Sequence, residues 1–525
     1  MSIAFDQEKT FSHIYRYVNG SFDITNYATS TAFDLFDDNA QVGDCIYFGR
    51  YNPSWSFHDL KFNIGTALMA MSITVVWEYK RGSSWVEIPN VTDGTNAFRN
   101  IGVNTVAFDI PQNFCYSSSN WYTYLTINGS RKYGFYVRCR ITAISGITEG
   151  GRTQTDTVKY KDFTITATDE TLNLATLQSV SDSGGWLARA GVPAIETLGV
   201  HTIIRPHLYF IGTTSFTEKN SSIELGEENY PAGWRNLGTG IIQLGERDVS
   251  GKGKNGCRLH MHTRFDSGYD YVYYVQAFAS IIYRRTGRYG AFAMGKVFKF
   301  VDSVFISNDR WYLTSYLQAG SEWTRSVYAD NDLLYLYSGN LSFDTFKSLD
   351  AWQGVLCGSG RPATFRNTDI NGKKIMRYYT ADIDLIDCTN IDTNNITSTA
   401  PNAYYPSLHV KVKYNGKLHI IDENNNSVEG ATVTVWNAKN DVVFSIVTGA
   451  DGLAEGIVTV YDKYWVRDEG WAEHNDDLNP FRMEVKKGNK KFTMDKFTID
   501  APVDWEIQLQ SGGSINKSFS KKIKL

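Results

Sequence analysis

Two histidines lie on one face of a strand predicted for residues 257–265. Because successive side chains of a strand point to opposite faces, His260 and His262 face the same way. Histidines at this spacing can ligate a metal ion. The arginines that share their face, Arg258 and Arg264, would repel a cation, and no third ligand is evident nearby. We therefore expect a polar outer face or groove here, with no metal and no cofactor.

Carboxylates are the next candidates for chemistry. A glycosidase needs two carboxyl groups at a defined separation in a cleft. Several glutamates lie near Trp234 in the sequence, namely Glu224, Glu227, Glu228 and Glu246. In a chain with 56 Asp+Glu, such neighbours arise by coincidence. The G-x-S-x-G, H-E-x-x-H, P-loop and Rossmann motifs are also missing. We predict no catalytic residue and a protein that is not an enzyme.

Two stretches look like parts of calcium loops. The segment from Asn367 to Gly372 copies the first half of an EF-hand loop, but Tyr378 stands where a bidentate glutamate is needed. This excludes an EF-hand. Asp330 and Asp332 could help to hold calcium in a loop, but an ordinary turn is the simpler interpretation.

A basic and aromatic stretch is the candidate contact surface. Its residues lie in a predicted loop and are Tyr283, Arg284, Arg285, Arg288 and Tyr289. Such side chains can stack on sugars or pair with an acidic partner; the alternative is a solvated hairpin end. The net charge is −4, from 52 Lys+Arg against 56 Asp+Glu, and gives no basic footprint. We therefore expect no nucleic-acid partner.

The composition indicates which type of secondary structure carries these residues. Of the 525 residues, 42% are hydrophobic and 21% charged, which excludes wholesale disorder. Aromatic residues make up 14%, and the chain has 44 Gly but only 11 Pro, a composition typical of strands and turns. We predict an all-β protein of tandem β-sandwiches, jelly-roll-like and Ig-like, with very little helix.

Strand signals are strongest in the first third of the chain. Residues 72–79 alternate strictly, with Trp77 and Tyr79 on one face and Glu78 on the other, and residues 85–88 return as a hairpin partner. Residues 133–141 form a further alternating strand. Short strands spaced by turns, without helical periods, favour an antiparallel sandwich.

Composition shifts divide the chain into four parts. We predict an N-terminal β-sandwich (1–165), a large jelly-roll or concanavalin-like β-sandwich (166–400), an Ig-like domain (401–510) and a flexible basic tail (511–525). No short-period repeat is visible.

The cysteines and the apolar stretches limit the cellular context. The six cysteines are widely separated, and no two of them form a CxxC motif. They are also too few for a disulfide scaffold, so we expect buried free thiols. The N-terminus has no apolar signal segment, and the most apolar stretches, near 66–77 and 272–282, are too short to span a membrane. We expect a protein made in the cytoplasm, without a signal peptide and without membrane insertion.

The N-terminal part resembles a β-sandwich module of tailed-bacteriophage virion structural proteins. The resemblance covers about residues 20–150. It rests on a W-x-Y-x-x-G-x-x-W hairpin containing Trp77, Tyr79 and Trp85, followed by Asp93-Gly94-Thr and later by an aromatic-Val-Arg-x-Arg strand. The resemblance implies a virion structural protein.

The C-terminal part is similar to carboxypeptidase-regulatory-like, transthyretin-type Ig-like modules. It shows Gly430-Ala431 before an alternating strand and the turn Asp451-Gly452. We expect close backbone approach at Gly430 and a positive φ in the turn. Such modules serve as spacers or adhesion units, not as catalysts.

Together these observations predict a non-enzymatic structural component of a tailed-phage virion, in a tail, baseplate or neck appendage. It would act in assembly and in host-surface attachment. Expected partners are other virion proteins, further copies of the chain in a homo-oligomer, since virions are symmetric, and a host cell-surface glycan. The alternatives are a head fibre or capsid decoration protein, and a carbohydrate-binding adhesin or polysaccharide depolymerase.

Overall fold

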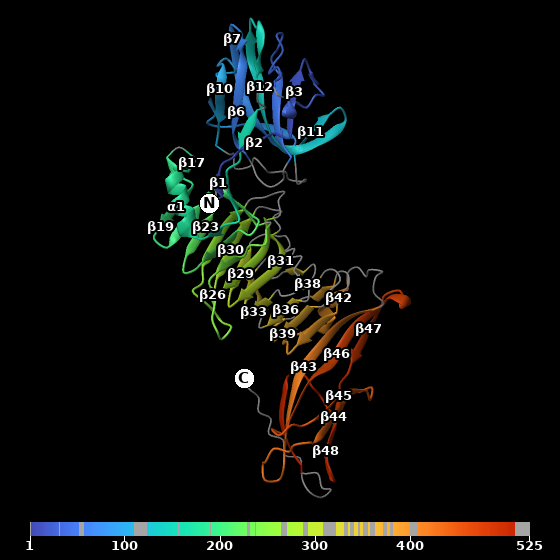
Figure 1. The fold of residues 1–525 in the computed structure, drawn as a ribbon. Coiled ribbons are helices and arrows are strands. Elements are labelled where there is room, and N and C mark those ends of the chain that lie inside the picture. The colour runs from blue at the N-terminus through green and yellow to red at the C-terminus, as the bar shows by residue number, and fades with distance from the viewer. Residues whose placement is uncertain are drawn as a thin grey trace. The chain divides into compact units, whose positions relative to one another are not determined.

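The computed structural model describes most of the chain (Figure 1). The described residues are 2–30, 32–51, 57–109, 123–154, 158–189, 191–227, 232–236, 238–263, 270–286, 292–307, 322–329, 334–336, 341–344, 347–349, 355–357, 363–370, 375–377, 382–398 and 407–509. These residues confirm the predicted all-β fold, since strands dominate and one α-helix is present among them. The chain divides into one unit of residues Met1–Met294 with Phe305–Trp311 and a second of Gly295–Val304 with Tyr312–Leu525.

The N-terminal part of the first unit is an antiparallel two-sheet module. One sheet follows the order β4 (Ser21–Phe22), β3 (His13–Val18), β5 (Cys45–Arg50), β12 (Ser130–Ser145), β7 (Ser72–Arg81) and β8 (Ser84–Glu87), with β11 (Thr123–Ile127) also paired to β12. The other follows β2 (Glu8–Thr10), β14 (Lys159–Lys161), β6 (His58–Met69), β10 (Gly102–Ala107) and β9 (Thr92–Asp93), with β13 (Glu149–Thr153) also paired to β6. A short 3-10 helix, η1 (Tyr27–Thr29), follows β4.

An aromatic core holds this module together. Trp77 and Tyr79 are buried in it, as the alternation along residues 72–79 predicts. Ring centroids of Phe62 and Phe98 lie 5.3 Å apart in an edge-on arrangement, and Phe62 also contacts Trp77 at 6.2 Å. Edge-on and tilted aromatic pairs of this kind stabilise a core beyond the area they bury.

The middle of the chain forms parallel ladders instead of an antiparallel sandwich. In the first unit one ladder contains β15 (Thr164–Thr168), β21 (His207–Ile211), β24 (Trp234–Asn236) and β29 (Asp270–Phe278). A second contains β16 (Thr171–Leu172), β22 (Ser215–Glu218) and β25 (Ile242–Leu244), and also reaches β29. A third contains β20 (His201–Ile204), β23 (Ser222–Leu225), β28 (Arg258–Thr263) and β30 (Ile281–Thr286).

These ladders are the sheets of a parallel β-helix, in which each coil contributes one strand to each sheet. The jelly roll predicted for residues 166–400 is therefore wrong for these strands, because a jelly roll pairs its strands antiparallel. Strands of the third ladder begin at residues 201, 222, 258 and 281, so most coils take about 20 residues. The longer step, from residue 222 to residue 258, contains the hairpin of β26 (Glu246–Arg247) and β27 (Gly253–Lys254). The coils are therefore a structural repeat, although no short-period repeat is visible in the sequence.

Stacked apolar side chains fill the inside of the coils. Ile223 on β23 stands opposite Leu259 on β28, which stands opposite Ile282 on β30, and all three are buried. A strand buried on one side only shows the same period-two alternation whether its neighbours run parallel or antiparallel. For β28 the alternation predicted the two faces of the strand but could not give the direction of its neighbours.

Glycines allow the coils to stack closely at their turns. A Cβ on Gly240 would lie 1.8 Å from the carbonyl oxygen of Thr214, and one on Gly238 would lie 1.8 Å from that of Gly212. Both carbonyls belong to the turn after β21, one coil earlier. Only glycine can approach a neighbouring backbone so closely.

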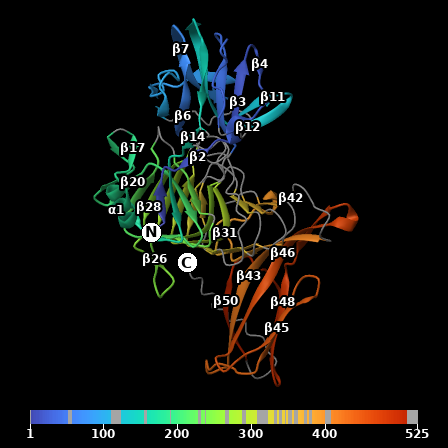
Figure 2. The same ribbon diagram turned by 45° about the horizontal axis from the view of Figure 1, so that its top comes forward.

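Near the first coil lies the α-helix α1 (Leu174–Gly184), which the sequence analysis did not predict. The Asn173 side chain caps its N-terminus by accepting from the Thr176 amide at 2.8 Å, and Gly185 ends it with a φ of 59°. The helix contacts β19 (Ile195–Leu198), which pairs antiparallel with β20 (Figures 1 and 2). A short hairpin of β17 (Leu187–Arg189) and β18 (Val192–Pro193) lies between them in sequence, and β1 (Ile3–Phe5) pairs with β15.

The second unit contains parallel ladders of the same kind. One follows β31 (Phe292–Val301), β33 (Glu322–Thr324), β36 (Leu341–Asp344), β39 (Ala363–Arg366), β41 (Ile383–Ile386) and β43 (Ser407–Ile421). Another follows β35 (Leu334–Leu336), β38 (Val355–Cys357), β40 (Ile375–Arg377) and β42 (Ile396–Ser398), and a third pairs β34 (Val327–Ala329) with β37 (Lys347–Leu349). The 3-10 helix η2 (Thr393–Asn395) also belongs to this unit, whereas most of the strand β32 (Val304–Ser307) belongs to the first unit.

The C-terminal module of the second unit has two sheets. In one, β43 pairs antiparallel with β46 (Leu453–Val466) and parallel with β50 (Val503–Gln508), and β46 pairs with β47 (Ala472–Asp477). The other follows β45 (Val442–Val447), β44 (Thr432–Trp436), β48 (Phe481–Lys487) and β49 (Lys490–Phe497). The 3-10 helix η3 (Arg467–Glu469) follows β46. The predicted tail, residues 511–525, lies outside the described residues.

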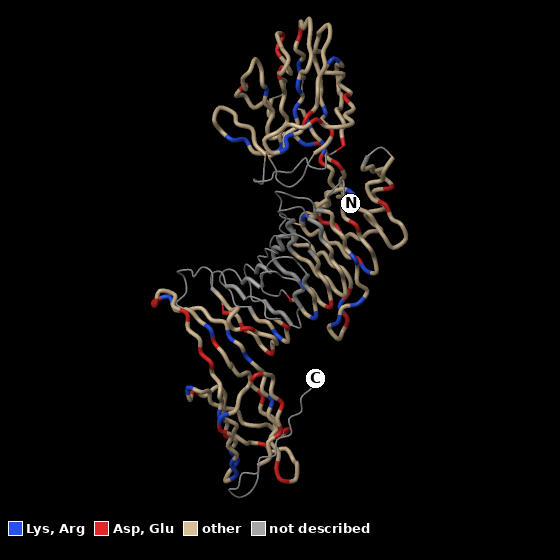
Figure 3. Tube along the Cα trace, turned by 180° about the vertical axis from the view of Figure 1, so that it is seen from behind, with Lys and Arg blue, Asp and Glu red and all other residues tan. Residues whose placement is uncertain are grey.

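Charges of both signs are spread over the described residues of each module (Figure 3). Four of the cysteines, Cys45, Cys139, Cys257 and Cys388, are buried free thiols, which confirms the prediction for them. Within the described residues no helix is long and apolar enough to cross a membrane.

Candidate functional site

The parallel β-helix of the first unit gathers polar side chains on the outer face of its third ladder. Glu224 on β23 stands directly opposite His260 on β28, which stands opposite Tyr283 on β30. The residues before and after Glu224, like those before and after His260, point into the coil and are buried. The alternation of a strand therefore places Glu224, His260, His262 and Tyr283 outside, and we call the first three the Glu224 cluster.

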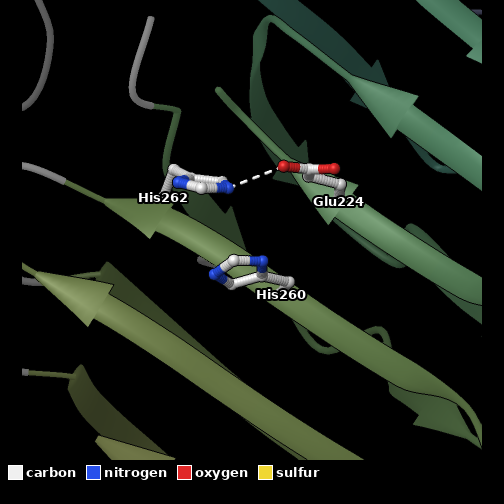
Figure 4. A group of neighbouring side chains, drawn as sticks. All are labelled: Glu224, His260 and His262. Atoms are coloured by element: carbon white, nitrogen blue, oxygen red, sulfur yellow. Dashed lines mark hydrogen bonds and ion pairs between the residues drawn. The ribbon is translucent and has the colours of Figure 1, made fainter. Parts of the chain in front are cut away.

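Short contacts connect the Glu224 cluster (Figure 4). Nε2 of His262 lies 2.7 Å from Oε1 of Glu224. The rings of His260 and His262 lie 4.2 Å apart, centroid to centroid, and one ligand atom from each of the three residues falls within 4.8 Å of the others. The ring of Tyr283 meets that of His260 edge-on at 4.7 Å.

A further histidine supports the carboxylate from the side. Nε2 of His201, on β20, lies 3.2 Å from Oε2 of Glu224, and its Nδ1 lies 3.1 Å from the hydroxyl of Ser222. Glu224 is therefore held between two histidines, one at each oxygen. This arrangement fixes the carboxylate while leaving it partly exposed, with 25% of its side chain accessible.

The two histidines that contact Glu224 differ in their exposure to solvent. The side chain of His262 is 9% exposed, whereas that of His201 is 36% exposed. The backbone of the loop before β24 passes close by, since the amide of Ala232 donates to the carbonyl of His262 at 3.1 Å. Partial burial strengthens electrostatic contacts relative to water, so this is a place where a carboxylate and imidazoles interact strongly.

The sequence analysis missed the third member of this cluster. It predicts that His260 and His262 share a face, which is confirmed, but its statement that no third ligand lies near them is wrong, because Glu224 does. Glu224 and His260 are 36 positions apart in the sequence, and only the parallel register makes them neighbours. Of the two arginines expected beside the histidines, Arg258 is exposed on β28, and Arg264 lies outside the described residues.

The predicted contact surface is only partly described. Tyr283, Arg284 and Arg285 belong to β30, a strand of a parallel ladder, so the predicted loop is wrong for them, and so is the alternative of a hairpin end. Tyr283 is half-buried against His260. The side chains of Arg284 and Arg285, and all of Arg288 and Tyr289, lie outside the described residues.

The glutamates near Trp234 do not form a carboxylate pair among the described residues. Glu227 binds Arg205 at 2.9 Å, and Glu246 binds Lys219 at 2.7 Å. Glu228 lies outside the described residues, as do Asp330 and Asp332 of the calcium hypothesis. Of the half-loop from Asn367 to Gly372, residues 367–370 are described; there Asp369 forms an isolated bridge with Thr389 and accepts from the side-chain amide of Asn390 at 2.9 Å.

In the N-terminal module the motif residues are structural. Oδ1 of Asp93 accepts from the amide of Thr95 at 2.9 Å, and its Oδ2 lies 3.4 Å from the indole nitrogen of Trp77. A Cβ on Gly94 would lie 2.7 Å from the carbonyl oxygen of Thr105, which explains the glycine. Asp93-Gly-Thr thus fastens a tight turn to the core tryptophan. Tyr79 is buried in the same core.

Trp85 belongs to the sheet that contains β7, β8 and β12, and on the outer face of that sheet it contacts a network of charged side chains. The guanidinium of Arg138 lies 4.3 Å from the centre of the Trp85 ring, a cation–π contact. Glu78 accepts from Arg138 at 2.7 Å and from Arg140 at 2.9 Å. Burial would raise the pKa of Glu78, but the hydrogen bonds from Arg140 and Arg138 outweigh it and hold that pKa below its ordinary value.

The motif glycines of the C-terminal module have different roles from one another. Gly452, after Asp451, has a φ of 71°, as predicted for the turn, and a Cβ there would lie 2.6 Å from the carbonyl oxygen of Ile420. Gly430 also has a φ of 71°, but a Cβ there would meet only the flexible end of Lys487. The expected close backbone approach thus lies at Gly452, and Gly430 is required by its left-handed conformation. Ala431 is fully buried.

Comparisons with known proteins identify no relative. No protein-family model matches the chain, and no curated protein matches it. Among solved structures, the catalytic domain of Agl-KA aligns with 74% of this chain and 88% of that chain, at 9% sequence identity and a TM-score of 0.14. A TM-score this low carries no argument about fold or function.

Proposed function

We propose that the chain is a non-enzymatic structural component of a tailed-phage virion, in a tail, baseplate or neck appendage, acting in assembly and in attachment to the host surface. The main support is backbone pairing beside each junction between modules. In the first unit β1, from which the chain enters the N-terminal module, pairs with β15 of the β-helix. In the second unit β41 of the ladder pairs with β43, which continues into the C-terminal module. Backbone hydrogen bonds beside both junctions suit a part that must transmit position and force.

The β-helix adds a second support. A solenoid presents a long surface made of repeated strands, which suits binding to extended polymers or to other proteins. The resemblance of residues 20–150 to a phage structural module agrees with this proposal. Symmetric assembly with further copies of the chain is expected from the symmetry of virions.

Immunogold electron microscopy tests this proposal. Antibody raised against residues 405–510 is applied to phage particles from the source culture, and label at one fixed site is the expected result. Label on the tail, baseplate or neck supports the proposal, and label on the head supports the alternative of a head fibre or decoration protein. An immunoblot of purified, denatured particles covers the case of a hidden epitope, and a blot without the chain overturns the proposal.

A carbohydrate-binding adhesin is the second candidate. The observation that favours it is the outward Tyr283 ring beside the Glu224 cluster, since an aromatic ring next to polar groups is the usual partner of a sugar. The test is a glycan array probed with the full chain. Tyr283→Ala should abolish a host-glycan signal, while Tyr124→Ala, in the N-terminal hairpin, should leave it unchanged. An array without hits argues against the adhesin.

A polysaccharide depolymerase remains the third candidate. It predicts new reducing ends when the full chain is incubated with host capsule or cell-wall glycan. Glu224→Gln is the decisive variant, because Glu224 is the half-buried carboxylate on this outer face. Glycan that releases no reducing ends, or an activity that survives Glu224→Gln unchanged, argues against a catalytic role for this site.

A further inference from the structure

We propose that Glu224, His260 and His262 bind one divalent transition-metal ion, with Zn²⁺ as the best fit. Two imidazoles and one carboxylate are a frequent ligand set for zinc in proteins, and also for non-haem iron. Their ligand atoms already lie within 4.8 Å of one another (Figure 4). Hard cations such as Ca²⁺ and Mg²⁺ prefer oxygen ligands only, so the two histidines select against them.

The backbone holds the three ligands in place. His260 and His262 occupy positions i and i+2 of one strand, and Glu224 lies directly opposite His260 on the neighbouring strand. Leu259 and Met261, on either side of His260, are buried inside the coil and oppose a shift of the strand. A site on two hydrogen-bonded strands is more rigid than one on loops.

Side-chain movements of up to about 1.5 Å are needed to take up the ion, because ligand atoms that now lie within 4.8 Å of one another must come to tetrahedral spacing. Zinc binds nitrogen and oxygen at about 2.0–2.2 Å, which places two ligand atoms of a tetrahedral site about 3.3 Å apart. Nε2 of His262 and Oε1 of Glu224 are now 2.7 Å apart, at hydrogen-bonding distance. Binding would replace the proton between them with the metal, and the pair would separate by roughly half an ångström.

His201 completes the arrangement as a positioning residue. It contacts Oε2 of Glu224 at 3.2 Å, so that Oε1 is left to face the other two histidines. Partners of this kind orient a ligand, and their loss typically costs about 10–100-fold in metal affinity. Ser222 in turn contacts the other nitrogen of the His201 ring at 3.1 Å.

Glu224 supplies a negative charge for a cation, and among the described side chains of β28 the one basic residue on the same face is Arg258, which is exposed. On β30, Arg285 stands opposite His262 in the ladder, and its side chain lies outside the described residues. Three protein ligands leave one tetrahedral position open, as in zinc sites that bind water or a substrate oxygen. Because Glu224 is 25% exposed, a ligand from solvent could reach that position.

Zinc binding by the full-length chain tests the proposal. After removal of metals with a chelator, isothermal titration with ZnCl₂ should give one strong site per chain, and elemental analysis after dialysis should give the same stoichiometry. His260→Ala and His262→Ala should each weaken binding at least about 100-fold, and His201→Ala about 10-fold. His474→Ala is the matched control, because His474 also pairs with a glutamate, at 2.7 Å, but in the C-terminal module.

A second measurement keeps the proposal testable if a variant fails to fold. Co²⁺ bound to the unaltered chain should give visible d–d absorption of tetrahedral character, which excess Zn²⁺ should abolish. Failure of the unaltered chain to bind zinc overturns the proposal, and so does zinc that remains bound in a folded His260→Ala/His262→Ala double variant. Neither result bears on the virion proposal, which immunogold labelling decides separately.

Discussion

Nε2 of His58 lies 2.9 Å from Oδ1 of Asp6, at the point where the chain leaves β1 and enters the N-terminal module. Nδ1 of the same ring lies 3.1 Å from Oδ1 of Asp59, and the ring of Phe163 packs edge-on against it at 5.7 Å. His58 thus bridges two carboxylates beside the junction between the N-terminal module and the β-helix.

This contact predicts a junction that weakens in alkali. Burial alone would lower the pKa of His58, but hydrogen bonds and charges from Asp59 and Asp6 outweigh it and raise the pKa to about 9. The group takes up a proton more readily when folded, so its contribution, up to about 3 kcal/mol, is complete below the unfolded pKa of about 6.5 and is lost as the pH rises through about 9.

Hydrogen exchange can follow this loss locally. Amides of β1 and β6, corrected for intrinsic exchange rates, should open more easily as the pH rises through about 9, and His58→Gln should remove that dependence. His419→Gln, in the C-terminal module, is the control and should leave it intact. A pH profile that is the same with and without His58 would contradict the assignment.

His207 predicts the opposite response in acid. Burial, together with Arg50 and Arg235, lowers the pKa of His207 to about 3. Its Nδ1 accepts from the Gly233 amide at 3.0 Å, which requires the neutral ring. The unfolded chain therefore binds the extra proton, and stability that is complete above about pH 6.5 is lost progressively as the pH falls toward about 3. Thermal melts of the full chain should show less acid sensitivity in His207→Gln; equal sensitivity would argue against this role.

Glu78 is predicted to be the costliest carboxylate of the N-terminal module to neutralise. Its side chain is 8% exposed and binds two arginines, so Glu78→Gln should destabilise the module by about 2–3 kcal/mol. The matched control is Asp34→Asn, which breaks the exposed pair with Arg152 and should cost less than about 1 kcal/mol. Urea unfolding followed by tryptophan fluorescence measures both, and equal effects would contradict the prediction.

Gly240 is predicted to be irreplaceable. Gly240→Ala would place a methyl group 1.8 Å from the carbonyl oxygen of Thr214, so one coil must move away from the next, at a cost of roughly 3 kcal/mol or more. Gly416→Ala is the control, because its new methyl group would meet its nearest neighbour at 3.6 Å, an ordinary contact. The yield of soluble protein and the thermal midpoint compare the two variants, and a Gly240→Ala protein as stable as Gly416→Ala would refute the argument.

The sequence predicted what depends on one strand at a time. Alternation placed Trp77 and Tyr79 in a core and His260 and His262 on a common outer face, and the glycine of Asp451-Gly452 has the predicted positive φ. These features follow from the period of a strand and from local turn chemistry.

The sequence could not show what depends on neighbouring coils. The strand containing Ile223 and Glu224 and the one containing Leu259 and His260 repeat the same order of inward and outward residues, but the coils differ in length and share no fixed motif. A search for repeated four-residue segments of this alternation would have been the available signal. The helix α1 also had one, since Asn173 precedes Leu174 and Leu177 at helical spacing.

The strand β43 has a mechanical consequence. Its first half is hydrogen-bonded in parallel to β41, and nearly its whole length is paired with β46. One uninterrupted backbone thus runs from the last ladder into the C-terminal module. A force along β43 would load many of its hydrogen bonds to β46 in shear at the same time. A force across the strand would instead break these bonds one after another. The C-terminal module should therefore withstand tension along β43 far better than tension applied across it.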